Sequence, residues 1–556
     1  MSHFFYPFKQ KTLATLFRFV IIFSLCHHHY FYPSAIVCYL CKMNNRILLI
    51  FPPLAKACEP PAGIARIAGF LRNNQQLTTL WDANIEGQEY LLKKEQTPED
   101  TWSKRAWKNK ETNLGALRDS VLYKNQDRYQ RAIRDLNRTL SQSCKKTGIN
   151  INLADYQDTN LSAHQSTDLL YAAQNYKQSI FYPFFKQRLS ELFADNDTGF
   201  IGISLNYLSQ ALVAFALAGY IRTHYPQQKL LIGGGLITSW LRSPGWKHPF
   251  GNLFDHIIEG AGEKPLLQIL KHRSNIIHSP PDFTDLPLTR YLSPGLIIPY
   301  SASSGCYWNR CSFCPEKAEG SSYSKLSSAE VLQDMQFLVE KFSPRLLHLL
   351  DNAVAPSLMK ELIRQPVGVD WYGFARISPE LANPGFCKKL RASGCLMLKL
   401  GIESGSQTVL DAMDKGIDLP LVEKCLVALQ AAGIAVYVYL LFGTPTETRV
   451  EARLTTDFTV RNADRIGFLN LAVFNLPKNS DEKKQLQVHN FSAGDLGLYS
   501  DFFHPKGWNR KKVRNFLTDE FKAEPEIRKI LQRDPPFFTS NHAVFMADAI
   551  SNNKEQ

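Results

Sequence analysis

The sequence predicts an α/β fold with two successive domains, a doubly wound parallel sheet followed by a partial (β/α) barrel. Apolar runs of strand length alternate with segments of helical periodicity from residue 46 to about residue 474. Glycines or polar residues follow most of these runs, as they do at the ligand-binding edge of parallel sheets. Three cysteines, Cys306, Cys311 and Cys314, directly follow the first strand of the second block.

Residues 1–42 contain no segment that fits the predicted sheet. The apolar run from Leu13 to Cys26 is interrupted by Arg18, and it is shorter than the about 20 apolar residues that a membrane-spanning helix needs. A clean strand begins just after Met43. We therefore expect residues 1–42 to be a dispensable leader or the result of a mis-assigned start, and we expect no membrane segment.

Residues 43–275 are predicted to form the doubly wound domain. Ile47 to Phe51 is a continuous apolar run, as a strand buried on both faces requires. Further strands are expected at Leu77 to Asp82, Phe200 to Leu205, Lys229 to Ile232 and near Phe254 to Glu259. The fourth strand ends at Gly233, Gly234 and Gly235. Glycines let a backbone approach a ligand closely. We therefore expect this edge of the sheet, at the carboxyl ends of the strands, to bind a ligand as Rossmann-like sheets do.

Residues 88–197 interrupt this domain and are predicted to be a mainly helical insertion. One predicted helix of this insertion has an apolar stripe on one side and an arginine-rich face beside it. That face contains Arg128, Arg131, Arg134 and Arg138. We interpret that face as a solvated helix surface rather than a partner-binding one. The insertion is expected either to cap the sheet or to help cover a substrate cavity.

Residues 290–477 are predicted to form six strand-then-helix units, enough for an open, partial barrel. The strands are expected at Leu296 to Tyr300, Leu346 to Leu350, Trp371 to Phe374, Cys395 to Ile402, Ala435 to Phe442 and about Ile466 to Phe474. The first helix carries the capping box Ser327-x-x-Glu330. Polar residues gather at the carboxyl ends of the strands, which form the active face of such barrels.

The cysteines Cys306, Cys311 and Cys314 have the spacing C-x4-C-x2-C. Three thiolates can bind three irons of a [4Fe-4S] cluster, whereas a structural zinc ion requires a fourth protein ligand and haem attachment requires C-x-x-C-H. The neighbouring Trp308 and Phe313 would give the sulfurs an apolar surrounding. Spacing alone leaves a zinc or structural interpretation open.

The cysteine loop and the strand ends together resemble the radical S-adenosylmethionine (SAM) enzymes, although the usual loop of that family is one residue shorter before the second cysteine. The resemblance implies that the three cysteines hold a [4Fe-4S] cluster whose fourth iron binds SAM. It also implies SAM contacts for a set of strand-end residues: Asp351, Asn352, Arg376, Glu403, Ser404, Gly443 and Thr444. An arginine suits a carboxylate independently, because the guanidinium fork matches its two oxygens.

The N-terminal blocks are similar to the cobalamin-binding domain that is fused to many radical SAM enzymes. The resemblance covers about residues 46 to 85 and 198 to 272, and it implies cobalamin contacts for Ser204 and for Gly233, Gly234 and Gly235. Methyltransferase-type cobalamin domains carry a cobalt-binding histidine after their first strand. Here the turn from Pro52 to Ala57 has no histidine, so we expect cobalamin to bind without a histidine on its lower face.

Residues 478–556 are predicted to be a C-terminal extension that packs onto the barrel. The formal net charge of the chain is +13, but the basic excess is diffuse and no nucleic-acid partner is expected. Because a cluster loop needs reduced thiols, a cytoplasmic location is expected. A small-molecule or peptide substrate and an electron donor such as flavodoxin or ferredoxin are the expected partners.

Three functions remain open on these observations. The first is a radical SAM enzyme that uses cobalamin to methylate or rearrange an unactivated carbon. The second is a cobalamin-independent radical SAM enzyme whose N-terminal domain binds a substrate or partner. The third is an iron-sulfur electron carrier or sensor, which would need no row of cofactor-binding strand ends. Cleavage of SAM separates the third function from the other two.

Overall fold

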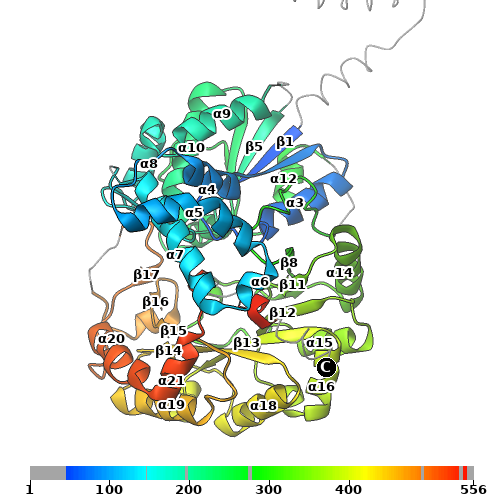
Figure 1. Cartoon of the computed structure of the whole chain (residues 1–556), viewed down its shortest axis with the longest axis vertical. Helices are drawn as coiled ribbons and strands as arrows, with labels where there is room; N and C mark the ends of the chain where they lie inside the picture. The colour runs from blue at the N-terminus through cyan, green and yellow to red at the C-terminus, as the bar shows by residue number, and fades with distance from the viewer. Residues whose placement is uncertain are drawn as a thin grey trace, which may run out of the picture.

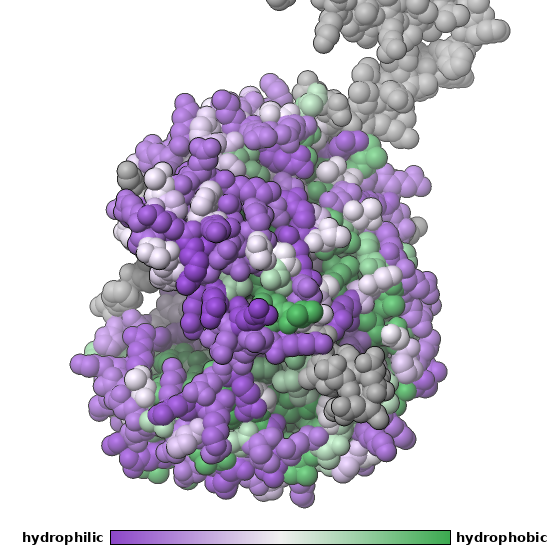
Figure 2. Space-filling model, in the orientation of Figure 1, coloured by the Kyte–Doolittle hydropathy of each residue, from purple (hydrophilic) through white to green (hydrophobic). Residues whose placement is uncertain are grey.

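The computed structural model describes residues 46–145, 147–194, 198–272, 278–489, 494–537 and 542–546. The predicted leader, residues 1–42, lies outside the described residues. Two lobes follow one another along the chain, and Figure 1 shows the N-terminal lobe above the C-terminal one. On the face shown in Figure 2, hydrophilic residues predominate in both lobes and hydrophobic residues are visible at the waist between them.

The N-terminal lobe is built on a five-stranded, wholly parallel sheet of order β2-β1-β5-β6-β7. Its strands are β1 (Arg46–Phe51), β2 (Thr78–Asp82), β5 (Thr198–Ser204), β6 (Lys229–Gly233) and β7 (His256–Ile257). The five predicted strands are therefore confirmed, the last one shorter than expected. The chain reverses direction across the sheet between β1 and β5, so the ligand crevice is expected at their carboxyl ends.

Both faces of this sheet are covered by helices, as its continuous apolar strands require. The side chains of Ile47 and Leu49 share a core with α3 (Ala62–Asn73) and α12 (Glu263–Ile269). The opposite face packs against three helices, α4 (Ala83–Lys93), α10 (Leu208–His224) and α11 (Gly235–Leu241). Apolar residues occupy all sides of α10 itself, so it has no solvent-facing polar stripe. This explains why twelve of its residues, Gln210 to Ile221, are buried.

The predicted insertion is mainly helical, and it lies against α4 and α10. It contains α5 (Thr101–Leu117), α6 (Ser120–Tyr123), α7 (Gln126–Ser143), α8 (Ser166–Gln174), η1 (Tyr176–Gln178) and α9 (Tyr182–Leu192), together with a hairpin of β3 (Ile149–Ile151) and β4 (Tyr156–Asp158). The apolar stripe of α7 is buried and its Arg128 and Arg131 are exposed. The predicted boundary at Gln88 lies inside α4, so the helical region begins earlier than expected, at Ala83.

The C-terminal lobe contains six parallel strands in the order β8-β11-β12-β13-β14-β15, which is an open, partial barrel as predicted. They are β8 (Ile297–Tyr300), β11 (Leu346–Leu349), β12 (Asp370–Ala375), β13 (Cys395–Glu403), β14 (Ala435–Phe442) and β15 (Phe468–Val473). The outer helices are α14 (Ser328–Phe342), α15 (Pro356–Arg364), α16 (Pro384–Ala392), α17 (Gln407–Ala412), α18 (Leu419–Ala431) and α19 (Arg449–Arg461), with η2 (Pro379–Ala382) between them.

The helix-forming signals of this lobe act as the sequence predicts. The Ser327 side chain accepts a hydrogen bond from Glu330 N at 3.2 Å, and the Glu330 carboxylate accepts one from Ser327 N at 2.9 Å. This capping box begins α14. Cys387, Cys395 and Cys425 are buried core thiols, as expected.

The C-terminal extension packs onto the barrel. It contains β16 (Leu476–Pro477), η3 (Asp481–Lys484), β17 (Tyr499–Ser500), α20 (Arg510–Asp519), η4 (Phe521–Ala523) and α21 (Pro525–Gln532). The Phe521 ring contacts that of Phe442 at the end of β14, 5.3 Å between centroids. The His542 ring stacks on Tyr437 inside the barrel, 4.5 Å away. Across the described ranges, no helix combines the length and apolar character that crossing a bilayer requires.

Candidate active site

The cysteine loop leaves the carboxyl end of β8, where the sequence places it. Its base is a short antiparallel pair of β9 (Ser303–Ser304) and β10 (Ser324–Lys325). Cys311 is buried, Cys306 and Cys314 are half-buried, and Cys314 directly precedes the short helix α13 (Pro315–Ala318). Asn309 adopts a left-handed backbone conformation, φ +45°, within the longer spacing between the first two cysteines.

The loop is seated on the segment between α17 and α18. Trp308 Nε1 donates a hydrogen bond to Asp414 O at 3.0 Å, and Ser312 N donates one to Met413 O at 3.0 Å. Gly416 lies directly beneath the Trp308 indole, because a Cβ at that position would come within 2.0 Å of the ring. The barrel thus fixes the loop through this aromatic contact and these backbone acceptors.

Three charged residues lie near Cys311: the predicted Arg376 and Glu403 at strand ends, and Lys415 from the segment between α17 and α18. Arg376 Nη1 lies 3.9 Å from Cys311 Sγ, and Arg376 Nη2 donates a hydrogen bond to Lys415 O at 2.5 Å. Lys415 Nζ pairs with Glu403 Oε1 at 2.8 Å. Burial raises the pKa of the Cys311 thiol, and the nearby Lys415 and Arg376 charges oppose that rise. Both cations therefore favour the thiolate form that a metal requires.

No three His, Cys, Asp or Glu side chains of the described residues converge on one point that could hold a single metal ion. The ligands of a [4Fe-4S] cluster each bind a different iron, so a cluster does not require such convergence. Cys306, Cys311 and Cys314 form no disulfide bond. The donor set of the loop therefore fits a cluster held by three thiolates.

The predicted pair Asp351 and Asn352 follows β11. Asp351 is buried, and its carboxylate accepts hydrogen bonds from Ala302 N at 3.1 Å and from the Ser303 hydroxyl. It therefore holds the base of the cysteine loop rather than facing a ligand. Asn352 is exposed and lines a cavity of about 650 Å³.

Ser404 was expected to contact SAM, but its side chain lies in the protein core. It is fully buried, and its hydroxyl lies 3.2 Å from Thr455 Oγ1 and accepts a hydrogen bond from Ser406 N at 3.1 Å. The strand end turns sharply at Glu403, whose φ is +69°, so the next side chain packs against α19. Glu403 itself remains beside the cysteine loop through its pair with Lys415.

The end of β14 forms a tight turn at Gly443, φ +82°, followed by the buried Thr444. Glu447 folds back under this turn and accepts hydrogen bonds from Gly443 N and from Trp508 Nε1, the latter at 3.0 Å. Burial raises the pKa of Glu447 to about 7. Thr444 Oγ1 has no hydrogen-bond partner among the described residues.

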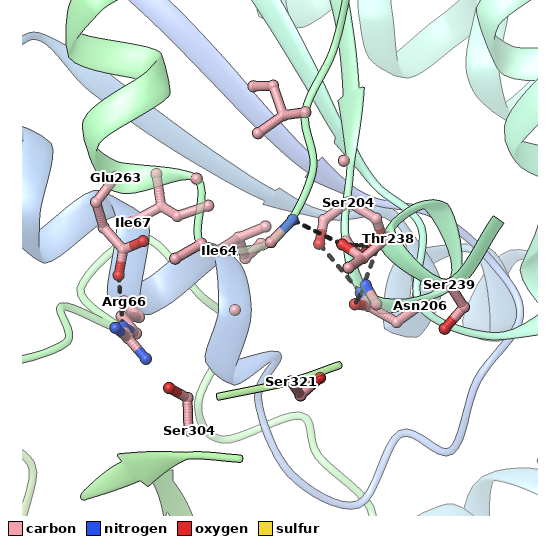
Figure 3. Close-up of a pocket in the computed structure, with 18 of the residues that line it drawn as sticks. Ile64, Arg66, Ile67, Ser204, Asn206, Thr238, Ser239, Glu263, Ser304 and Ser321 are labelled. Atoms are coloured by element: carbon pink, nitrogen blue, oxygen red, sulfur yellow. Dashed lines mark hydrogen bonds and ion pairs between the residues drawn. The ribbon is translucent and has the colours of Figure 1, made fainter. Parts of the chain in front are cut away.

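The cavity beside the cysteine loop has a volume of about 650 Å³ and is lined by both lobes. Figure 3 shows Ser204, Asn206 and Thr238 on the N-terminal side, and Ser304 and Ser321 opposite them. The predicted Ser204, Gly233, Gly234 and Gly235 all lie in its wall, as do Gly63, Gly202, Gly260 and Gly262. The three cysteines do not line it, although Gly305, directly before Cys306, does.

The glycine side of this cavity suits a large ligand. Near Gly63 a Cβ would meet only Ser204 Oγ, at 3.8 Å, and near Gly235 only Asn206 Oδ1, at 3.7 Å. Side chains at these positions would therefore occupy space that now belongs to the cavity. Gly235 N donates to Asn206 Oδ1 at 2.9 Å, and Asn206 Nδ2 donates to Ser204 Oγ at 3.0 Å. This cradle fits the nucleotide-like tail of cobalamin, which needs a slot between sheet and helices.

The turn after β1 provides no histidine, as the sequence indicates. It is held in place by side chains of neighbouring helices: Gln210 Nε2 donates to Pro52 O at 2.7 Å, and Ser209 Oγ donates to Leu54 O at 2.8 Å. Ala55 N donates to Asn84 Oδ1 at 2.8 Å. This turn and the residues that follow it line a second cavity, of about 540 Å³.

The second cavity contains polar residues that the sequence did not single out. They are Lys56 and Glu59 from the segment after β1, His348 from β11 and Lys399 from β13. His348 and Lys399 are polar residues within otherwise apolar strands. This interruption of the apolar pattern is the sequence signal that could have identified them. Glu59 carried no signal of its own, because its contact with His348 joins residues 289 positions apart.

Comparisons with known proteins come from sequence and from structure. No family model matches the chain. A bacteriochlorophyllide d C-12(1)-methyltransferase of Chlorobaculum tepidum is 24% identical over 326 residues, which cover 54% of this chain and 70% of that protein. An uncharacterized methyltransferase of Pyrococcus horikoshii is 24% identical over 206 residues, covering 35% of this chain and 42% of that protein.

Two solved structures share the architecture. The radical SAM methyltransferase TsrM of Kitasatospora setae, solved with tryptophan and a SAM analogue, superposes with a TM-score of 0.55 at 14% identity, covering 92% of this chain and 99% of that one. TsrM was also solved with cobalamin and a [4Fe-4S] cluster bound. The apo form of the cobalamin-dependent SAM radical enzyme OxsB gives a TM-score of 0.52 at 12% identity, covering 86% and 67%. The resemblance read from the sequence is confirmed: this chain has the two-domain fold of the cobalamin-dependent radical SAM enzymes.

Proposed function

We propose that this chain is a cobalamin-dependent radical SAM methyltransferase that acts on an unactivated carbon of a small molecule. One observation carries the proposal. The cavity of about 650 Å³ is walled on one side by the glycine cradle of the Rossmann-like sheet and on the other by the base of the cysteine loop. A cofactor held in that cradle would therefore adjoin the loop that holds the cluster.

Cys306, Cys311 and Cys314 would hold a [4Fe-4S] cluster, and Arg376, Glu403 and the Gly443 turn would hold SAM beside it. When bound, the cluster supplies one electron that cleaves SAM to methionine and a 5′-deoxyadenosyl radical, and cobalamin supplies a carrier for the transferred methyl group. The residues of this chain position both groups. The seat of Trp308 on residues 413–416 fixes the loop, and Asp351 fixes its base.

Gly233, Gly234 and Gly235 would hold the tail of cobalamin, and the turn from Pro52 to Ala57 would face its lower side. Because that turn contains no histidine, we propose a cobalt without a histidine ligand below it. The N-terminal domain is then a cofactor module, which sets this proposal apart from a radical SAM enzyme that works without cobalamin.

The substrate proposed is a small molecule. The curated C. tepidum relative is named for methylation of a bacteriochlorophyllide, and TsrM was solved with its tryptophan substrate; both substrates are small molecules. We further propose that a flavodoxin or ferredoxin supplies the electron. A cytoplasmic location suits a cluster loop built from free thiols.

Purified, anaerobically reconstituted protein tests the proposal. Hydroxocobalamin is added, the excess is removed by gel filtration, and the absorption spectrum is recorded. A stoichiometric corrinoid spectrum is expected, and the Co(II) resonance spectrum should lack nitrogen hyperfine coupling from a histidine. A histidine coupling would overturn the ligation proposed here, and no retained corrinoid would favour the cobalamin-independent enzyme.

A further inference from the structure

The second cavity contains a buried polar chain in the interior of the barrel. Its volume is about 540 Å³, within the range of small-molecule sites. His348 projects into it from β11, and Lys399 projects from β13. Glu59, from the segment after β1 in the other lobe, contacts His348. The two lobes thus contribute jointly to this wall.

The hydrogen bonds among Glu59, His348 and Lys399 all point the same way, from Lys399 through His348 to Glu59. Glu59 Oε2 lies 3.0 Å from His348 Nδ1, and His348 Nε2 lies 2.9 Å from Lys399 Nζ. A carboxylate accepts, so the imidazole donates through Nδ1 and its Nε2 accepts from the lysine. Burial and the Lys399 charge lower the pKa of His348, so the ring is neutral. It also stacks on Tyr372, 4.3 Å between centroids, which fixes its plane.

Lys399 has unused hydrogen-bonding capacity. The residue is only 1% exposed, and a fully buried lysine is rare unless it is paired. His348 is its only hydrogen-bond partner among the described residues, and a lysine amine has two or three N–H donors. Its amine lies over the Phe374 ring, 4.3 Å from the centroid, on the wall of the cavity. Burial lowers the pKa of Lys399 to about 7, and the negative charge of Glu59 opposes that fall only in part.

The wall of the cavity is otherwise mainly apolar and carries an excess of positive charge. Its charged residues are Lys56, Lys399 and Glu59, so one positive charge remains when Lys399 is protonated and His348 is neutral. Much of the remaining wall is apolar: Phe51, Ala55, Pro60, Pro61, Ala62, Ala154, Pro299, Leu350 and Phe374. A ligand with an apolar body and one anionic group would match both properties.

We propose that the barrel side of this cavity, formed by His348, Phe374 and Lys399, is the substrate site, whereas the turn from Pro52 to Ala57 on its other side faces cobalamin. Lys399, positioned by His348 and Glu59, then binds a carboxylate of a largely apolar substrate. The inference rests on the proposed function, because it assigns the substrate class of the same enzyme. Gly63, Ser204, Asn206 and Leu350 line both cavities. A substrate anchored at Lys399 therefore extends toward the cavity that adjoins the cysteine loop, where the radical chemistry would occur.

A matched pair of fluorescent probes tests the proposal. The probes are 1-pyrenebutyrate, which has an apolar body and a carboxylate, and 1-pyrenebutanol, which has the same body without the charge. Each is titrated into the reconstituted full-length chain at pH 7. Wild-type protein should bind the carboxylate at least tenfold more tightly than the alcohol.

Two substitutions change the charge of the wall in opposite directions. Lys399→Met removes the anchoring cation and should abolish the preference for pyrenebutyrate. Glu59→Gln keeps an acceptor for His348 but removes a negative charge, so it should tighten pyrenebutyrate binding severalfold and leave pyrenebutanol unchanged. Loss of fold would weaken both probes together, whereas this proposal requires opposite changes in the two variants. Lys360→Met, an exposed lysine paired with Glu380 on the barrel exterior, is the matched control.

The outcomes separate this inference from the proposed function. Wild-type protein that holds its cluster and cleaves SAM but binds the two probes equally, or binds neither, would overturn the carboxylate site alone. A preference that survives Lys399→Met would also overturn it. Failure of the proposed function would instead appear as wild-type protein without a cluster or without SAM cleavage.

Discussion

The glycine cradle offers the sharpest test of the cobalamin site, because two adjacent glycines are required for different physical reasons. Gly235 begins α11, and near it an added Cβ would meet only Asn206 Oδ1, at 3.7 Å. Gly234 has a φ of +108°, and its Cβ would come within 2.4 Å of Leu205 O. Gly235→Leu therefore places a side chain in the cavity without backbone strain, and Gly234→Ala strains the turn.

The two substitutions should act on stability with opposite signs. Replacing a helical glycine removes backbone entropy from the unfolded chain, so Gly235→Leu should stabilise the fold by about 0.5–1 kcal/mol. Forcing an alanine into a left-handed conformation costs about 1–3 kcal/mol, and in Gly234→Ala the contact with Leu205 adds to that cost. Both should lower cobalamin affinity at least tenfold, which corresponds to about 1.4 kcal/mol.

The assay combines corrinoid retention after gel filtration with the thermal unfolding midpoint of each variant. Gly115→Leu, in α5 with no neighbouring atom within 4 Å of its Cβ, is the control for adding a leucine elsewhere. Gly235→Leu protein that is as stable as wild type and lacks corrinoid would support the site. If that variant retains a full complement of corrinoid, the cavity does not hold the cofactor and the reasoning fails.

Two further predictions concern the cysteine loop and the Gly443 turn. Gly416→Ala should lose most of its iron, because the new Cβ would lie 2.0 Å from the Trp308 ring. The control Gly433→Ala, also at positive φ but with no neighbour within 4 Å of the new Cβ, should keep its iron. Equal iron contents in the two variants would contradict the seating of the loop. Burial raises the pKa of Glu447 to about 7. The protonated carboxyl group therefore stabilises the folded state fully below pH 4.5, the ordinary glutamate pKa in the unfolded state, and this stabilisation is lost as the pH rises through 7. Relative to Glu447→Gln, wild-type protein should therefore lose roughly 2–3 kcal/mol between pH 4.5 and pH 8 in urea unfolding, and a pH-independent difference would exclude this role.

The strands could be predicted because most of them are continuous apolar runs bounded by polar residues or glycines. Ala435–Phe442 was predicted at its observed bounds, and the alternation of strands with helices correctly indicated that both sheets are parallel. The cysteine loop was visible because its ligands lie close together in sequence. Its neighbour Lys415 was not, because only the fold brings it to Glu403.

The errors have a common physical cause. Ser404 was expected to reach a ligand, but side-chain direction at a strand end depends on the local turn, and the left-handed Glu403 points Ser404 into the core. The polar chain of Glu59, His348 and Lys399 joins three separate segments. Periodicity shows which residues share a strand face, but it does not show which distant segment will face them.

Reductive cleavage of SAM tests the central claim most directly. Wild-type chain is reconstituted with iron and sulfide under anaerobic conditions, reduced with dithionite and incubated with SAM, and methionine and 5′-deoxyadenosine are quantified. Wild-type protein should hold about four irons and release both products, and the triple variant Cys306→Ala, Cys311→Ala, Cys314→Ala should do neither. A triple variant that still holds about four irons per chain, or a wild-type cluster that leaves SAM intact, would contradict the account.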